Sequence, residues 1–294
     1  MSSTFQLLKQ LSAAACLTCV VSNFANSEES NKKLVPGKIV VAGVTGKVEA
    51  VEPESKSARA LKQNDLVTEK STVNVDKASS TTLAFWNGST VNLSENSSLV
   101  ISQFLQDPFG VHNSETVLTE EPTTSVTKLD LIKGKVVCDV KKLRTAQGSS
   151  LIVNTPVGAA GVRGTIFAVS YVQDAGGGGK WTHTLSVTEG SVSLTDSNGR
   201  VTIVNAGQEV VASVRVTVDA TSGEPKVVEV LEFEVKDIPM DRQDAINQEA
   251  KKGKDASIEV YVGLMEFSVQ DGLKKALDNA PPVVDPDPVT DPNP

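Results

Sequence analysis

The stretch that decides the fold reads Asn154-Thr155-Pro156-Val157-Gly158-Ala159-Ala160-Gly161-Val162-Arg163-Gly164-Thr165-Ile166-Phe167-Ala168-Val169. Short alternating strands precede and follow it, and here the alternation breaks at three glycines and one proline. Glycine permits positive φ and a close approach of the backbone, whereas Pro156 favours an extended Thr155 and cannot donate to a strand ladder. We therefore expect a strand, a tight corner and a second strand, with Arg163 at the corner.

Arg163 has two interpretations. Its guanidinium can satisfy turn carbonyls or pair with a carboxylate such as Glu189, which would make it a structural clamp. Alternatively, it is a cation that binds a partner or ligand. We favour the clamp, and the motif indicates neither a reaction nor a ligand. The motif residues are Thr155, Pro156, Gly161, Val162, Arg163, Gly164, Thr165 and Glu189.

A glycine followed after one residue by valine occurs three times inside strand-like runs. The copies are Val44-Thr45-Gly46-Lys47-Val48-Glu49, Ile132-Lys133-Gly134-Lys135-Val136-Val137 and Thr188-Glu189-Gly190-Ser191-Val192-Ser193. A glycine within a strand pattern marks a bulge or bend, so we expect equivalent kinks in related strands. Because the spacing is not constant, the copies do not establish a fixed-period solenoid.

Period-two apolar patterning and frequent turn signals, such as Asn87-Gly88, predict an all-β architecture. We expect an irregular β-sandwich or a solenoid-like β-domain of short hairpins, with a small mixed C-terminal extension. The predicted division is a signal peptide (1–27), a lead-in (28–38), the β-domain (39–212), an extension of strands and helices (213–280) and a disordered Pro/Asp tail (281–294). Helices are expected over 241–252 and 264–279, and a surface loop over 106–124.

The N-terminus has the pattern of an export signal. Lys9 precedes a short apolar run, and Ala25-Asn26-Ser27 supplies small residues for cleavage. A short buried helix and a lipoprotein attached through Cys16 are the alternatives. We expect a periplasmic or extracellular protein in which Cys138 has no internal disulfide partner and is a buried inert thiol, with a reactive or cross-linking thiol as the other option.

The composition argues against several partners. The formal net charge is −8 and the pI about 5.0, which disfavour nucleic acid and a polybasic membrane anchor. After the leader, no stretch is apolar and long enough to span a bilayer, so we expect no transmembrane span in the mature chain.

Catalytic and metal-binding patterns are weak. His112 and His183 lie far apart in the sequence, there is no Gly-x-Ser-x-Gly elbow, and the carboxylates Asp174 and Glu189 could only be imagined as a glycosidase pair. We therefore expect no catalytic residue, no metal and no cofactor.

The motif resembles the core signature of the FecR domain family. Besides Thr155-Pro156 and Gly161-Val162-Arg163-Gly164-Thr165, the matching pieces are Leu131–Val136, Val187–Val192 and Ala206-Gly207-Gln208, and the likeness covers roughly residues 40–212. The resemblance implies an extracytoplasmic all-β domain, whose named members relay a signal from an outer-membrane receptor across the inner membrane to a sigma factor. We expect a stand-alone exported member without the anti-sigma and transmembrane parts.

The leading functional hypothesis is a non-enzymatic interaction module of the cell envelope. It would bind another envelope protein or a surface polymer through sheet edges or loops, with surface signal sensing as one role. A structural envelope or matrix spacer is the alternative, and a carbohydrate-active enzyme is a weaker one. The sequence leaves the oligomeric state open.

Overall fold

The computed structural model describes residues 33–54, 57–108, 118–176, 179–218 and 225–278. The predicted signal peptide with Cys16, His112, and the Pro/Asp tail lie outside these residues. The described part belongs to one compact unit that begins at Lys33. None of the described helices is long and apolar enough to cross a bilayer.

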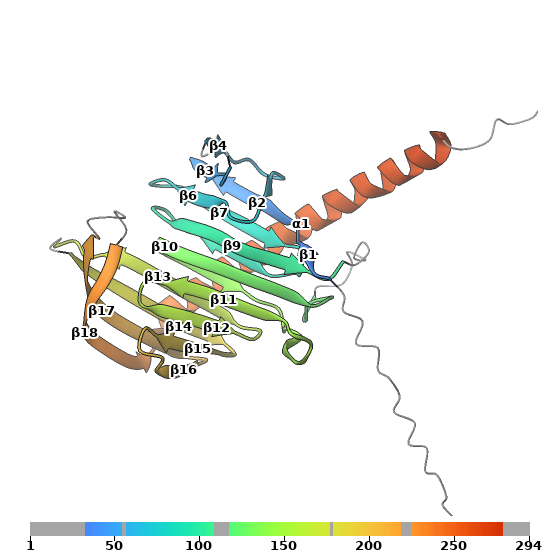
Figure 1. The fold of residues 1–294 in the computed structure, drawn as a ribbon. Helices are drawn as coiled ribbons and strands as arrows, with labels where there is room; N and C mark the ends of the chain where they lie inside the picture. Colours follow the sequence, from blue (N-terminus) through green and yellow to red (C-terminus); the bar gives the residue numbers. More distant parts are fainter. Residues whose placement is uncertain (1–32, 55–56, 109–117, 177–178, 219–224, 279–294) are drawn as a thin grey trace, which may run out of the picture. The chain divides into compact units, whose positions relative to one another are not determined.

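Two β-sheets make up most of the described chain (Figure 1). We call them sheet A and sheet B. Sheet A runs in the order β4 (Ala58–Ala60), β3 (Val48–Val51), β6 (Thr72–Val75), β9 (Ser98–Gln106), β10 (Ser125–Asp139), β11 (Ser150–Thr155), β12 (Gly158–Val162), β15 (Ser191–Asp196) and β16 (Val201–Asn205), with β1 (Val35–Pro36) beside β9. Sheet B runs in the order β5 (Leu66–Val67), β2 (Ile39–Thr45), β7 (Ser80–Phe85), β8 (Thr90–Leu93), β10, β13 (Ile166–Gln173), β14 (Lys180–Glu189), β17 (Gln208–Val218) and β18 (Pro225–Asp237). The prediction of an all-β domain is confirmed.

Strand β10 belongs to both sheets. Its first part pairs with β9 and β11 in sheet A, and its second part pairs with β8 and β13 in sheet B. The change occurs at Gly134, which has φ +94°. A Cβ at this position would collide with Ser97, so both the backbone conformation and the space require glycine here.

The other two glycine–valine copies are corners of the same kind. Gly46 lies between β2 and β3, and Gly190 lies between β14 and β15, so the chain passes from sheet B to sheet A at each. Both glycines have positive φ, +72° and +77°. The prediction of equivalent kinks in related strands is therefore confirmed, and the kinks are the points where the chain changes sheet.

The main hydrophobic core lies between the two sheets. Phe85 and Phe104 are fully buried and meet edge to face with their ring centroids 5.0 Å apart. Cys138 belongs to this core, where burial raises the pKa of its thiol far above the usual range. The thiol is therefore protonated at neutral pH, in agreement with the prediction of an inert buried cysteine.

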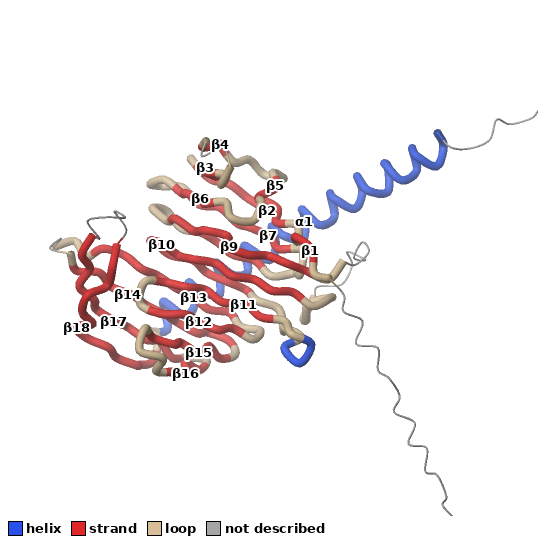
Figure 2. The backbone as a smooth tube through the Cα atoms, viewed as in Figure 1, coloured by secondary structure: helices blue, strands red, loops and turns tan. Residues whose placement is uncertain are grey.

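One continuous helix, α1 (Met240–Asp278), replaces the two separate helices expected over 241–252 and 264–279. It contacts strands β2, β7, β8, β10, β13 and β14, which all belong to sheet B (Figure 2). Ile246 and Ala250 pack against Val137 and Ala168, which point away from the main core. Within the segment that the sequence pattern left out, Val260 and Ala256 pack against Val40, Ala42 and Ala84 of sheet B. Such tertiary contacts override weak local helix propensity.

The predicted boundary at residue 212 falls inside β17. This strand continues to Val218 and pairs along its whole length with β18. Sheet B therefore extends beyond the predicted β-domain into the predicted C-terminal extension.

Candidate functional site

The first part of the motif forms the hairpin between β11 and β12. The Thr155 hydroxyl accepts hydrogen bonds from the backbone N–H groups of Val157 and Gly158, both at 3.3 Å, and donates to the Gly158 carbonyl at 3.1 Å. Pro156 lies inside this turn, where it pre-sets φ. Thr155 and Pro156 thus have a structural role.

The second part of the motif is the corner between β12 and β13. Val162 is buried and pairs in register with Leu151 and Val192, while Gly161 pairs with Ser193. After the corner, the Thr165 N–H donates to the Val140 carbonyl at 3.1 Å and its carbonyl accepts from the Val140 N–H at 2.9 Å. The backbone is therefore fixed on both sides of Arg163.

Two neighbouring segments stack on this corner. Gly164 has φ +90°, and a Cβ there would lie 2.8 Å from the Cα of Lys142. A Cβ at Gly190 would lie 2.7 Å from both the Gly164 carbonyl oxygen and Thr165 Cγ2. We call the three stacked segments the corner row and define it by the exposed charged residues that it carries, Lys142, Arg163 and Glu189.

The described residues show no clamping contact of Arg163. Its side chain is exposed and makes no hydrogen bond or ion pair with any residue that the structure describes, Glu189 included. Backbone hydrogen bonds between Thr165 and Val140 and the close contacts of Gly164 and Gly190 hold the corner. Within the described part of the chain, the guanidinium of Arg163 therefore has no partner.

Arg163→Ala is accordingly expected to change the free energy of unfolding by less than about 0.5 kcal/mol, because the substitution removes no described contact. Urea unfolding followed by circular dichroism measures this. A loss above about 1 kcal/mol would restore a structural role for the guanidinium.

Glu121 supports the corner row and was missed in the sequence, where it fell in the expected loop 106–124. It is fully buried: its carboxylate accepts from the Arg144 N–H and from the Ser125 hydroxyl, both at 2.6 Å. Its backbone N–H donates to the Lys142 carbonyl at 3.1 Å. Glu120 and Glu121 stand together before Pro122, and nothing in this sequence pattern distinguishes the buried Glu121 from a solvated loop residue.

The carboxylates Asp174 and Glu189 do not form a catalytic pair. Asp174 lies at the hairpin end of β14 and accepts from the Thr182 hydroxyl at 2.7 Å, whereas Glu189 is the last residue of that strand. They therefore lie at opposite ends of a ten-residue strand, which is too far for the acid and base of glycoside hydrolysis.

His183 is a core residue. It lies on β14 opposite Tyr171, and neither its Nδ1 atom nor the Tyr171 hydroxyl has a hydrogen-bond partner in the described part. Trp181 stacks on Tyr171 with the ring centroids 4.7 Å apart. Burial lowers the pKa of His183 to about 4 and raises that of Tyr171 to about 12. Within the described residues no group of three His, Cys, Asp or Glu side chains could hold a metal ion.

The buried imidazole makes stability depend on pH. The folded state keeps His183 neutral down to about pH 4, whereas the unfolded chain binds a proton below about pH 6.5. Acidification through this window should cost about 3 kcal/mol, and the contribution is fully present above pH 6.5. Unfolding measured between pH 7 and pH 4 should lose this dependence in His183→Leu. An unchanged pH profile in that variant would contradict the assignment.

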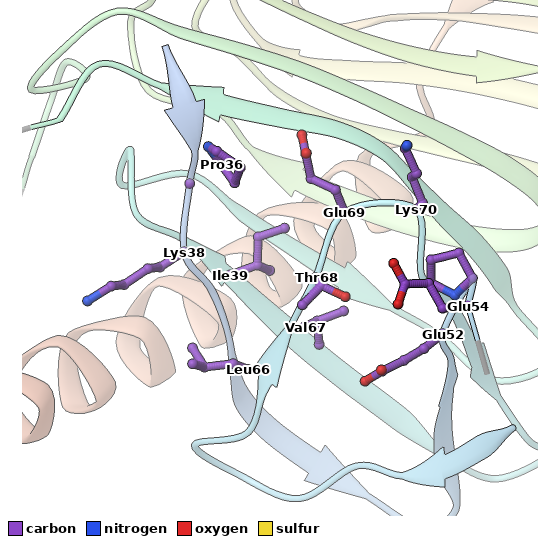
Figure 3. A pocket seen from close by; sticks show the side chains of 12 residues that line it. Pro36, Lys38, Ile39, Glu52, Glu54, Leu66, Val67, Thr68, Glu69 and Lys70 are labelled. Atoms are coloured by element: carbon purple, nitrogen blue, oxygen red, sulfur yellow. The ribbon is translucent and has the colours of Figure 1, made fainter. Parts of the chain in front are cut away.

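A pocket of about 510 Å³ lies beside β5, the outer strand at one end of sheet B (Figure 3). Ile39 and Val67 are buried and lie among its lining residues, together with three glutamates and two lysines. Glu69 accepts from the Phe104 N–H at 2.6 Å, and Glu52 lies 3.6 Å from Arg59. Glu54 has no partner among the described residues.

Comparison with protein families gives a match to the family described as FecR protein over residues 71–193. These residues form a FecR domain. The FecR domain spans β6 to the middle of β15 and includes the whole corner row together with Gly134. The family predicted from the motif is therefore confirmed, over a shorter range than the 40–212 expected.

Other comparisons add little. No curated protein matches the chain. Two crystal structures of a candidate anti-sigma factor from Parabacteroides distasonis, at 1.65 and 2.50 Å resolution, align with 16% identity and a TM-score of 0.39. Each alignment covers 60% of this chain and 64% of the other, so the match spans less than two thirds of that protein.

Proposed function

We propose that this FecR-domain chain is an exported, non-enzymatic interaction module of the cell envelope that takes part in surface signal sensing. The observation that carries the proposal is the exposed guanidinium of Arg163, which has no partner among the described residues and lies in the stretch that matches the FecR family. Glycine contacts and backbone hydrogen bonds fix the position of its Cα. A planar guanidinium can donate two parallel hydrogen bonds to a carboxylate, which suits recognition of a carboxylate on a partner.

The corner row defines the chemistry of that partner. Lys142 and Arg163 place two cations on adjacent segments of a chain whose net charge is −8, and Glu189 follows on the next segment. A complementary protein surface would present carboxylates to the two cations and a basic or neutral group to Glu189.

Two observations support the proposal. Asp174 and Glu189 are separated along β14 and His183 lies in the core, so these candidates form no acid–base pair. The leader-like N-terminus fits an exported protein.

Affinity capture tests the proposal. Residues 28–294, immobilised, are incubated with an envelope extract, and bound proteins are identified by mass spectrometry. We expect Arg163→Glu to abolish capture of a specific envelope protein. Lys128→Glu, an equal charge change at an exposed position of β10, should retain it. Equal capture by both variants would reject the corner row as the binding site, and capture of no envelope protein by the unmodified chain would favour the structural spacer instead.

A further inference from the structure

Strand β18 is the last strand of sheet B. Among the described strands it pairs with β17 alone, so the backbone groups on its other edge are open. Three of its apolar side chains are exposed, Val230 by 51%, Leu231 by 39% and Val235 by 42%. Long edge strands with exposed apolar residues readily accept another strand unless charges, prolines or bulges prevent it.

The first half of β18 is irregular, whereas the second half is regular and carries charges at Glu232, Glu234, Lys236 and Asp237. Two register shifts against β17 skip Leu231 and Val228 in the first half. From Glu232 to Asp237 the strand pairs with β17 without interruption. A further strand can therefore add along residues 232–237, where the pleat is regular.

The sequence at the centre of this regular segment is self-complementary. Glu234 and Lys236 flank Val235, and within one chain their side chains form an exposed ion pair at 3.2 Å. In an antiparallel pair of identical strands centred on Val235, Glu234 of one chain lies directly opposite Lys236 of the other. Opposite charges at facing positions stabilise such pairs, and like charges destabilise them.

We propose that β18 is a homodimer interface in which two copies of this chain pair antiparallel about a two-fold axis at Val235. The pairing would join the two copies of sheet B into one continuous sheet and bring the two Val235 side chains together. The strand supplies the same surface to both partners, as a closed two-fold interface requires.

The lengths of the other edges support a second copy at β18 over head-to-tail association. The other outer strands of the two sheets are shorter: β5 has two residues, β4 has three and β16 has five, whereas β18 has thirteen. A head-to-tail contact would match β18 with one of these shorter strands and leave most of it open. Pairing of two copies about Val235 aligns residues 233–237 of each chain with the same residues of the other.

A charge swap tests this interface. Sedimentation equilibrium of the unmodified chain at micromolar concentrations should show a dimer. Glu234→Lys places lysines opposite lysines at both symmetric positions and should weaken dimerisation by about tenfold or more. The double variant Glu234→Lys/Lys236→Glu restores opposite charges and should recover the dimer, while Glu54→Lys, an equal net charge change far from β18, should leave it intact.

The double variant separates assembly from folding, because a misfolded single variant would not be rescued by a second surface substitution. Far-ultraviolet circular dichroism should be the same for all four proteins. A monomeric unmodified chain, or a Glu234→Lys variant that dimerises as tightly as the unmodified chain, would overturn the proposal.

Discussion

Gly134→Ala is expected to lower the free energy of unfolding by about 2–4 kcal/mol. Two costs add up. An alanine at φ +94° is strained by about 1 kcal/mol or more, and its Cβ would enter the space of Ser97, which requires a backbone shift costing about 1–3 kcal/mol. The shift would disturb the point where β10 changes sheet. Urea unfolding followed by tryptophan fluorescence measures the loss.

Gly199→Ala is the matched control. Gly199 also has positive φ, +77°, but a Cβ there would meet no atom within 4 Å. It should cost only about 1 kcal/mol, so the difference between the two variants isolates the contact with Ser97. Equal losses in both variants would show that backbone strain alone is at work and that the approach of β10 to Ser97 is not tight.

Arg242→Ala is expected to lower the free energy of unfolding by about 2–3 kcal/mol. Arg242, at the start of α1, donates to the Glu209 carboxylate at 2.8 and 3.0 Å. Glu209 is completely buried and otherwise accepts only from the Ser186 hydroxyl at 2.9 Å among the described residues. Without the arginine, a buried carboxylate loses its counter-charge, which costs more than the pair contributes; the half-exposed arginine keeps the loss moderate.

Arg215→Ala removes an ion pair of the same length. Arg215 lies 2.8 Å from Glu229, but both side chains are more than half exposed, so the loss should stay below about 0.5 kcal/mol. Chemical unfolding of the two variants side by side gives the comparison. If Arg242→Ala lowered the free energy of unfolding as little as Arg215→Ala, water would solvate Glu209 in the variant. The ion pair would then not be what holds α1 to β17.

The sheet-changing corners could be predicted from the sequence because their cause is local. A glycine inside a valine-rich strand has few explanations other than a bend, and Gly46, Gly134 and Gly190 all adopt positive φ. The all-β class followed from the same alternation. These features depend on residues within one or two positions of each other, which is the range that sequence patterns report reliably.

The surroundings of Arg163 could not be predicted because they depend on contacts between segments far apart in the sequence. Thr165 exchanges backbone hydrogen bonds with Val140, and the Arg163 side chain has no partner among the described residues. Glu121 was missed for the same reason, because its buried carboxylate accepts from the N–H of Arg144, which lies 23 residues further along the chain.

The continuity of α1 was missed for a related reason. Gly253 lies in the gap between the two predicted helices, where a helix former would be expected, yet a Cβ there would press against the Asn92 side chain. The glycine serves the close contact of α1 with β8, and Asn92 in turn donates to the Glu249 carbonyl at 3.2 Å. A residue that weakens a helix in isolation thus permits its docking.

The sharing of β10 between the sheets has a mechanical consequence. A force applied to one sheet, for instance by a protein bound to the corner row, is transmitted to the other sheet through the continuous backbone of β10, because no loop separates the two parts of this strand. Neither sheet can separate from the other without breaking hydrogen bonds of β10, so we expect the two sheets to unfold together in one cooperative transition.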